Sequence, residues 1–172
     1  MNPVDKMSGV DDFNFLIGKW RVRHITLMGR LVGATEWAEA DAIDVVSPAF
    51  AGLGNVGKFI RFVDGQPYEG MPTRLYDTRI GQWRIWWLDT IDHRMEPPLV
   101  GRVENGSGLF EGNDLLRGKP IKVRFTWSNI TQTTARWDQA FSPDGGQSWE
   151  LNSIMEFTRD NSLPDSPTHA NL

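Results

Sequence analysis

His24 is the residue in this sequence best suited to acid–base chemistry near neutral pH. It lies four positions after Trp20, in a segment where apolar and polar residues alternate. Side chains of a strand alternate between its two faces, so if Trp20 points into the protein, His24 does too. At about 3.3 Å per residue it would lie about 13 Å from Trp20, inside any cavity. It could act there as a general base or as a hydrogen-bond partner of a ligand; the alternative is a neutral histidine bonded to an interior Glu or Tyr without chemistry.

Glu39 and Asp41 share a strand face with Trp37. If Trp37 is interior, one or both carboxylates are interior as well, and a buried carboxylate needs a partner. Arg74, His24 or Arg136 could supply that partner, and Arg74 could also stabilise an anion. His24, Glu39 and Arg74 are therefore the candidate catalytic residues, and a purely structural ion pair is the alternative.

Aromatic side chains are the second chemical feature, with eight Trp and nine Phe against two Tyr. The neighbours Trp86 and Trp87 must face opposite sides of a strand, so one of them is interior. An aromatic wall with a few polar groups suits a small-molecule pocket, although it equally suits a filled core. The residues expected to contact a ligand are His24, Trp37, Arg74, Tyr76, Trp86, Trp137 and Gln139.

Several other chemistries are disfavoured by the composition. The chain has no cysteine, and its three histidines lack the spacing of metal ligands, so neither a metal site nor a cofactor is expected. The Gly-rich passage 51–57 precedes a strand rather than a helix, unlike a phosphate-binding loop. A net charge of -4 gives no footprint for nucleic acid.

Nothing in the sequence predicts contact with a membrane. No apolar run approaches the roughly 20 residues that span a bilayer, and the first ten residues lack the apolar region of a secretory signal. We therefore expect a cytoplasmic protein.

The elements that must position these residues are strands. Apolar and polar residues alternate almost continuously from residue 20 to 159, without helical periodicity. The candidate strands are 20–28, 34–46, 58–63, 70–77, 82–89, 99–104, 108–112, 121–128, 134–141 and 148–158. About ten sequential strands on short turns would leave long exposed edges unless the sheet closed. The sequence thus predicts an all-β fold, an antiparallel up-and-down β-barrel.

The two ends of the chain complete this prediction. Asp11 and Asp12 could start one or two helical turns that Gly18 ends, giving a short helical plug for the barrel. We expect a flexible N-terminus over 1–10, a single barrel domain over 11–160, and a disordered Pro-rich tail over 161–172.

Gly18-Lys19-Trp20 at the head of the first strand resembles the Gly-x-Trp signature of lipocalins and the wider calycin group. In those folds the Trp closes the barrel floor, and an Arg near the end of the last strand lies over it. Arg159 ends the last strand here, so the resemblance implies a cation–π contact between Trp20 and Arg159.

A longer set of segments resembles a bacterial family of uncharacterised lipocalin-like proteins, the DUF1579-like group. These segments are residues 15–20, 54–56, 74–77, 86–89, 144–150 and 157–159. The resemblance implies a calycin barrel with an internal cavity and brings no established reaction. Nitrobindins are lipocalin-like barrels that hold haem through a His of a late strand; residues 148–159 contain none, so haem would need His24 or His93 in an unmatched position.

Residues 142–149 fit the Asp-box pattern of sialidases, with Ser148 in place of Thr. Sialidase propellers repeat this box on several blades, whereas this chain has one copy and too few residues for a propeller. We interpret it as a hairpin in which Asp144 caps backbone amides, Gly146 supplies a positive φ and Trp149 covers the loop.

Three hypotheses follow for function. The first is a barrel that binds a small apolar or aromatic molecule, with Trp37, Trp86 and Trp137 as walls. The second is a cofactor-independent isomerase, cyclase or lyase that uses His24 or Glu39 as general base in the same cavity. The third is a barrel with a filled core whose exposed aromatic residues serve oligomerisation, as in a homodimer.

Overall fold

The sheet of this protein closes on itself. The computed structural model describes residues 9–172, and within them eleven strands form one antiparallel sheet. The strands are β1 (Gly18–Leu27), β2 (Trp37–Ala49), β3 (Gly54–Val63), β4 (Gln66–Gly70), β5 (Thr73–Asp77), β6 (Gln82–Trp86), β7 (Leu99–Glu104), β8 (Ser107–Leu116), β9 (Lys119–Ser128), β10 (Thr134–Ser142) and β11 (Glu150–Arg159). Three 3-10 turns accompany them: η1 (Asn14–Leu16), η2 (Phe50–Gly52) and η3 (His169–Asn171).

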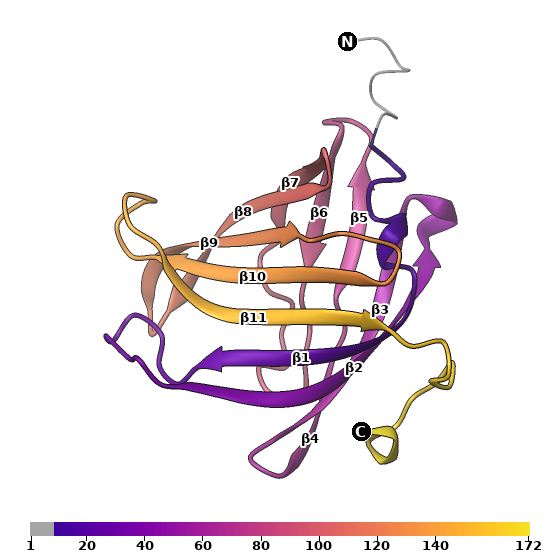
Figure 1. Cartoon of the computed structure of the whole chain (residues 1–172). Coiled ribbons are helices and arrows are strands. Elements are labelled where there is room, and N and C mark those ends of the chain that lie inside the picture. Colours follow the sequence, from indigo (N-terminus) through magenta and orange to yellow (C-terminus); the bar gives the residue numbers. More distant parts are fainter. Residues whose placement is uncertain (1–8) are drawn as a thin grey trace.

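Closure follows from the pairing of the first strand with the last, together with the pairing of β2 with β3. β1 pairs with β11 along one side and with β2 along the other, and β2 pairs with β3. β3 pairs with β5 through its first residues and with β4 through its last. Ten strands thus complete the ring and β4 extends it (Figure 1). The predicted all-β antiparallel barrel is confirmed.

Alternation along the strands decides which residues enter the interior. On β1, Trp20, Val22 and His24 are buried while Arg21 and Arg23 are exposed. On β9, every second residue from Ile121 to Trp127 is buried. The prediction that His24 points inward with Trp20 is confirmed.

The floor of the barrel is built by the N-terminal segment together with both ends of the β1–β11 pair. Trp20 Nε1 donates a 2.7 Å hydrogen bond to the carbonyl of Leu16, and the guanidinium carbon of Arg159 lies 4.1 Å from the Trp20 ring centroid. Arg159 also donates to the carbonyls of Phe15 and Ile17 at 2.7 and 2.9 Å. The predicted contact between Trp20 and Arg159 is therefore present.

The plug itself differs from the prediction, because η1 is a single 3-10 turn and no α-helix forms. Gly18, at φ 131°, already begins β1, and a Cβ at this position would lie 2.2 Å from Arg159 Nη1. Because β1 begins at Gly18, the segment before it is too short to form a stable α-helix. It closes the barrel through burial of Phe13 and Leu16, and Phe13 packs edge-on against Trp83 at 5.0 Å.

Strand β4 was not expected from the sequence, which predicts a turn at 64–67 and one strand over 70–77. The turn consists of Asp64 and Gly65, and Pro67 lies within β4 opposite Phe62. Among the described strands β4 pairs only with β3, with one isolated bridge from Gly70 to Asp89 on its other side. It is therefore an edge strand, where a proline is tolerated.

The C-terminal tail is ordered, in contrast to the disorder that its composition predicts. Leu163 is buried against Ile43 and Ile60 on the outer face of β2 and β3, and His169 Nε2 lies within hydrogen-bonding distance of the carbonyls of Arg61 and Tyr68. Apolar residues on the outside of the barrel thus provide a surface for the tail. The prediction of a flexible stretch over 1–10 falls mainly on residues 1–8, outside the described residues.

The Asp-box segment forms the β10–β11 hairpin, as predicted. Asp144 accepts hydrogen bonds from the amides of Gln147 and Ser148 at 3.0 and 2.9 Å, Gly146 has φ 102°, and Trp149 Nε1 donates to the Gly146 carbonyl at 3.1 Å. The hydrogen bond from the Ser148 hydroxyl, with those from the two amides, holds the pKa of Asp144 below its usual range. The polar groups of the box are therefore engaged within its own turn.

Within residues 9–172, no helix has the length and apolar character required to cross a membrane.

Candidate functional site

Two cavities share a wall inside the barrel. The inner cavity has a volume of about 30 Å³ and the outer one about 130 Å³. Four side chains line both, and we call them the central ring: Trp87, Phe125, Trp137 and Met155. The ring makes an apolar boundary between the inner cavity, which is mainly apolar apart from Asp44 and Arg74, and the more polar outer cavity.

Arg74 of β5 lies at the centre of the inner cavity. Its Nη1 donates a 2.9 Å hydrogen bond to Asn55 Oδ1, and its guanidinium carbon lies 5.8 Å from the ring centroid of Trp127. Its Nε has no hydrogen-bond partner in the described structure. Burial lowers the pKa of Arg74 to about 10, and the nearby Asp44 opposes this shift. Arg74 therefore stays charged at neutral pH.

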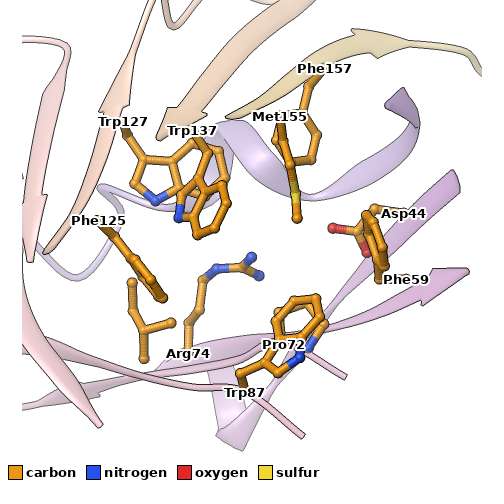
Figure 2. Close-up of a pocket in the computed structure, with 11 residues that line it drawn as sticks. Asp44, Phe59, Pro72, Arg74, Trp87, Phe125, Trp127, Trp137, Met155 and Phe157 are labelled. Atoms are coloured by element: carbon orange, nitrogen blue, oxygen red, sulfur yellow. The ribbon is translucent and has the colours of Figure 1, made fainter. Parts of the chain in front are cut away.

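Asp44 of β2 faces the same cavity. Figure 2 shows its carboxylate and the guanidinium of Arg74 both directed into the space between them. Asp44 is only 1% exposed, and its Oδ1 has no partner among the described residues. Burial raises the pKa of Asp44 to about 6, although the charge of Arg74 acts against the rise. The inner cavity is thus lined by a buried carboxylate and a buried guanidinium, and both have unused hydrogen-bonding capacity.

Sequence reasoning missed Asp44. The available signal was a single acid inside the apolar run 42–46, where both neighbours on each side are apolar. Both faces of this part of β2 are buried, one by the barrel and the other by the tail, so alternation gave no indication of its direction.

His24 of β1 lines the outer cavity. Its Nε2 lies 2.8 Å from Ser153 Oγ on β11, and its Nδ1 has no partner among the described residues. Burial, reinforced by the charges of Arg61 and Arg30, lowers the pKa of His24 to about 3. His24 is neutral at physiological pH, and a base this weak is poorly matched to proton abstraction.

Arg30 and Arg61 also line the outer cavity. Arg30 packs over the ring of Phe141 at 5.3 Å, and Arg61 over the ring of Tyr68 at 5.1 Å. Burial lowers the pKa of both guanidinium groups. Neither group forms an ion pair with a carboxylate of residues 9–172.

Three acids border the outer cavity from the β6–β7 loop. Asp89 is saturated, because it accepts hydrogen bonds from Tyr68, from Trp87 and from two backbone amides of its own loop. Asp92 is exposed. Burial, together with the charges of Asp114 and Asp92, raises the pKa of Glu96 to about 7.

Four of the predicted site residues lie in these cavities. Arg74 lines the inner one, His24 and Gln139 the outer one, and Trp137 both. Gln139 donates a 2.9 Å hydrogen bond to Asn152 Oδ1 from the neighbouring strand β11.

Glu39 and Trp37 lie on the outer surface, contrary to the prediction. Glu39 forms an ion pair with Arg23 on the outside of β1, and Trp37 is 40% exposed. The inner face of β2 carries the small residues Ala38, Ala40 and Ala42 instead. The prediction failed because it placed the largest side chain of the strand inside.

Trp86 and Tyr76 are also absent from the two cavities. The residues of β6 that point inward are Trp83 and Ile85, and Trp87, next along the chain, takes the interior place expected for Trp86. Tyr76 is buried near the N-terminal plug, where its ring packs against Trp83 at 5.5 Å.

No group of three or more His, Cys, Asp or Glu residues able to hold a metal ion occurs in the part of the chain that the structure describes.

Comparisons with known proteins bear on the fold alone. No protein-family model matches the chain, and no curated protein does, so the DUF1579-like resemblance stays a prediction. The S-type phycobiliprotein lyase CPES from Guillardia theta matches with a TM-score of 0.59 and 10% identity, over 92% of this chain and 97% of that chain. A protein of unknown function from the DUF3598 family of Nostoc punctiforme matches with a TM-score of 0.26 and 8% identity, over 89% of this chain and 99% of that chain. The likeness to the lyase identifies the fold as a lipocalin-like, closed antiparallel β-barrel.

Proposed function

We propose that this barrel binds a small apolar or aromatic molecule in its interior. The observation that carries the proposal is the central ring, which presents two tryptophans, a phenylalanine and a methionine to both cavities. Aromatic walls with a few convergent polar groups are typical of small-molecule sites. The likeness to a barrel named as a phycobiliprotein lyase supports ligand handling at this coarse level.

The volumes of the two cavities limit the size of the ligand. Typical sites for drug-sized molecules measure roughly 300–1,000 Å³, whereas the larger cavity here is about 130 Å³. A one- or two-ring molecule therefore fits the proposal best. Met155 is the ring member that can adapt, because a methionine has three rotatable side-chain bonds and changes rotamer at low cost. Its movement would join the two cavities.

The polar groups of the outer cavity would orient the ligand. The imidazole of His24 is neutral, and its Nδ1 has no protein partner among the described residues, so it can exchange a hydrogen bond with a bound molecule. Ser153 fixes the other ring nitrogen. We assign His24 a binding role rather than a role in proton transfer.

An isomerase, cyclase or lyase on the same barrel is the second candidate, with a different base. Glu39 lies outside and His24 is too weakly basic, whereas Asp44 combines a pKa of about 6 with burial beside Arg74. A substrate that reached the inner cavity would meet an acid–base group and a cation. The loss of turnover in Asp44→Asn, by about 10² or more, would distinguish this enzyme from a binding protein.

The binding proposal can be tested with 2-naphthamide, a neutral two-ring probe, by tryptophan fluorescence and thermal unfolding. Binding should quench the fluorescence, and at 100 times the dissociation constant it should stabilise the fold by about 2.7 kcal/mol. Trp137→Phe should remove most of the quenching, while Trp86→Phe, on the outer side of the barrel, should keep it.

A blocking variant makes the test independent of fluorescence. Gln139→Trp would fill the outer cavity and abolish the thermal shift without unfolding the protein. An equal thermal shift in Gln139→Trp and the native protein would place the probe elsewhere and contradict the proposal.

A further inference from the structure

We propose that the outer cavity is a binding site for an organic carboxylate, whose anionic group is held by Arg30 and Arg61 and whose apolar body rests on the central ring. This inference deepens the proposed function and rests on it, because it names the class of ligand that the interior would accept.

The first observation is a pair of cations that form no ion pair with a described carboxylate. Arg30 and Arg61 line one cavity, and neither forms an ion pair with a described carboxylate. The charge of Arg30 is one cause of the lowered pKa of Arg61, so the two groups repel each other within the fold. An anion placed between them would relieve this repulsion.

The second observation is unused hydrogen-bonding capacity at the same place. Arg61 Nε and His24 Nδ1 are buried atoms without a partner among the described residues. Buried polar groups are almost always hydrogen-bonded, so each such atom calls for an explanation. A guanidinium group also matches a carboxylate geometrically, since its parallel N–H groups can bind both oxygens.

The acids around the outer cavity favour a ligand with a single negative charge over one with two. Asp89 already accepts four hydrogen bonds, and it attracts Arg61 only through space, as Asp64 does, without forming an ion pair. Asp92 and Glu96 attract Arg30 from the β6–β7 loop, although neither reaches ion-pairing distance. A dianion such as a phosphate ester would be repelled by these acids more strongly than a monoanion, which favours a carboxylate.

The third observation is the apolar surface behind the two arginines. The same cavity is lined by the central ring, which separates it from the inner chamber. A carboxylate bound by Arg30 and Arg61 would therefore carry its apolar part toward Trp87, Phe125 and Trp137. Charge and apolar contact together distinguish this site from one for inorganic anions.

The test uses two probes of nearly the same shape, 2-naphthoate and 2-naphthamide, titrated by calorimetry at pH 8. 2-Naphthoate should bind the native protein at least about tenfold more tightly, as expected for hydrogen bonds to a charged group. Arg61→Gln and Arg30→Gln should each weaken 2-naphthoate by about tenfold and 2-naphthamide by less than about twofold. Arg61→Lys should restore part of the affinity, because it keeps the charge and loses the paired N–H groups.

Arg102→Gln on the exposed face of β7 is the matched control and should bind both probes like the native protein. Denaturant unfolding of each variant checks that the fold is intact. Equal affinities for the two probes, or an equal loss of both in Arg61→Gln, would overturn the carboxylate site and leave the proposed function standing. Failure of both probes to bind would overturn the two proposals together. Displacement of 2-naphthoate by an equal concentration of inorganic phosphate would show that the site recognises charge alone, which would contradict the carboxylate site.

Discussion

At the scale of single residues, the interior chemistry depends on how strongly each titratable group is desolvated. His24 and Asp44 both enter the barrel, and burial favours the neutral form of each. For the histidine this means a base too weak to take a proton near pH 7. For the aspartic acid it brings the pKa to about 6, closer to neutral pH than that of His24.

The raised pKa of Asp44 predicts how stability depends on pH. The folded protein holds this proton up to about pH 6, whereas an unfolded chain releases it near pH 4. Retaining this proton therefore contributes to the stability of the folded state. That contribution is complete below about pH 4 and is lost as the pH rises to about 6. Asp44→Asn should therefore gain stability relative to the native protein between pH 4 and pH 7, on the order of 2 kcal/mol.

Denaturant unfolding at a series of pH values measures this difference. Asp41→Asn, on the exposed outer face of the same strand, is the control variant. A constant difference between Asp44→Asn and the native protein across this range would contradict the raised pKa.

At the scale of elements, the C-terminal tail explains an otherwise unusual strand. The middle of β2 is buried on both faces, because the barrel covers Ala42, Asp44 and Val46 while the tail covers Ile43 and Val45. Lys19 adds polar contacts to the tail, at 2.7 Å from the Leu163 carbonyl and 2.7 Å from Asp165. The tail thus acts as an outer layer of the sheet in this region.

Leu163→Ala should destabilise the protein by about 2–3 kcal/mol, the usual cost of removing a buried leucine side chain. Leu163 is 4% exposed and packs among Ile43, Val45 and Ile60. Leu115→Ala serves as the control, because Leu115 is 60% exposed and its truncation should cost close to nothing. Equal denaturation midpoints for the two variants would show that the tail does not pack on β2 and β3 in solution.

At the scale of the whole molecule, closure of the barrel joins the first strand to the last. Trp20 pairs with Arg159 across the β1–β11 ladder, and the Arg159 side chain ties the N-terminal segment to the same point. The floor is therefore a junction of three parts of the chain that are far apart in sequence. Its residues carry stability, while the proposed binding groups lie farther along the interior.

Arg159→Leu should cost about 2–4 kcal/mol, because it removes the cation–π contact and leaves the carbonyls of Phe15 and Ile17 without their donors. Arg21→Leu removes an exposed ion pair with Asp160 on the outer wall and should cost less than about 1 kcal/mol. Chemical denaturation of the two variants measures both costs. A loss in Arg159→Leu no larger than in Arg21→Leu would contradict the structural role of the floor.

The sequence by itself predicted ten of the eleven described strands, their antiparallel closure and an inward His24 beside an inward Trp20. These features depend on local alternation, which a single chain records directly. The floor contact was implied by the resemblance to lipocalins. Arg74, Trp137 and Gln139, which were expected to contact a ligand, line the two cavities.

Only the tertiary structure decided which face of β2 is interior, where the tail lies and which charged groups share a cavity. Trp37 looked like a wall residue and Asp44 did not, because alternation specifies two faces without saying which one the rest of the chain will cover. Arg30 lies after β1 and Arg61 on β3, and no spacing in the sequence relates them. Their proximity, and the pKa values that follow from burial, arise only when distant strands close around a common interior.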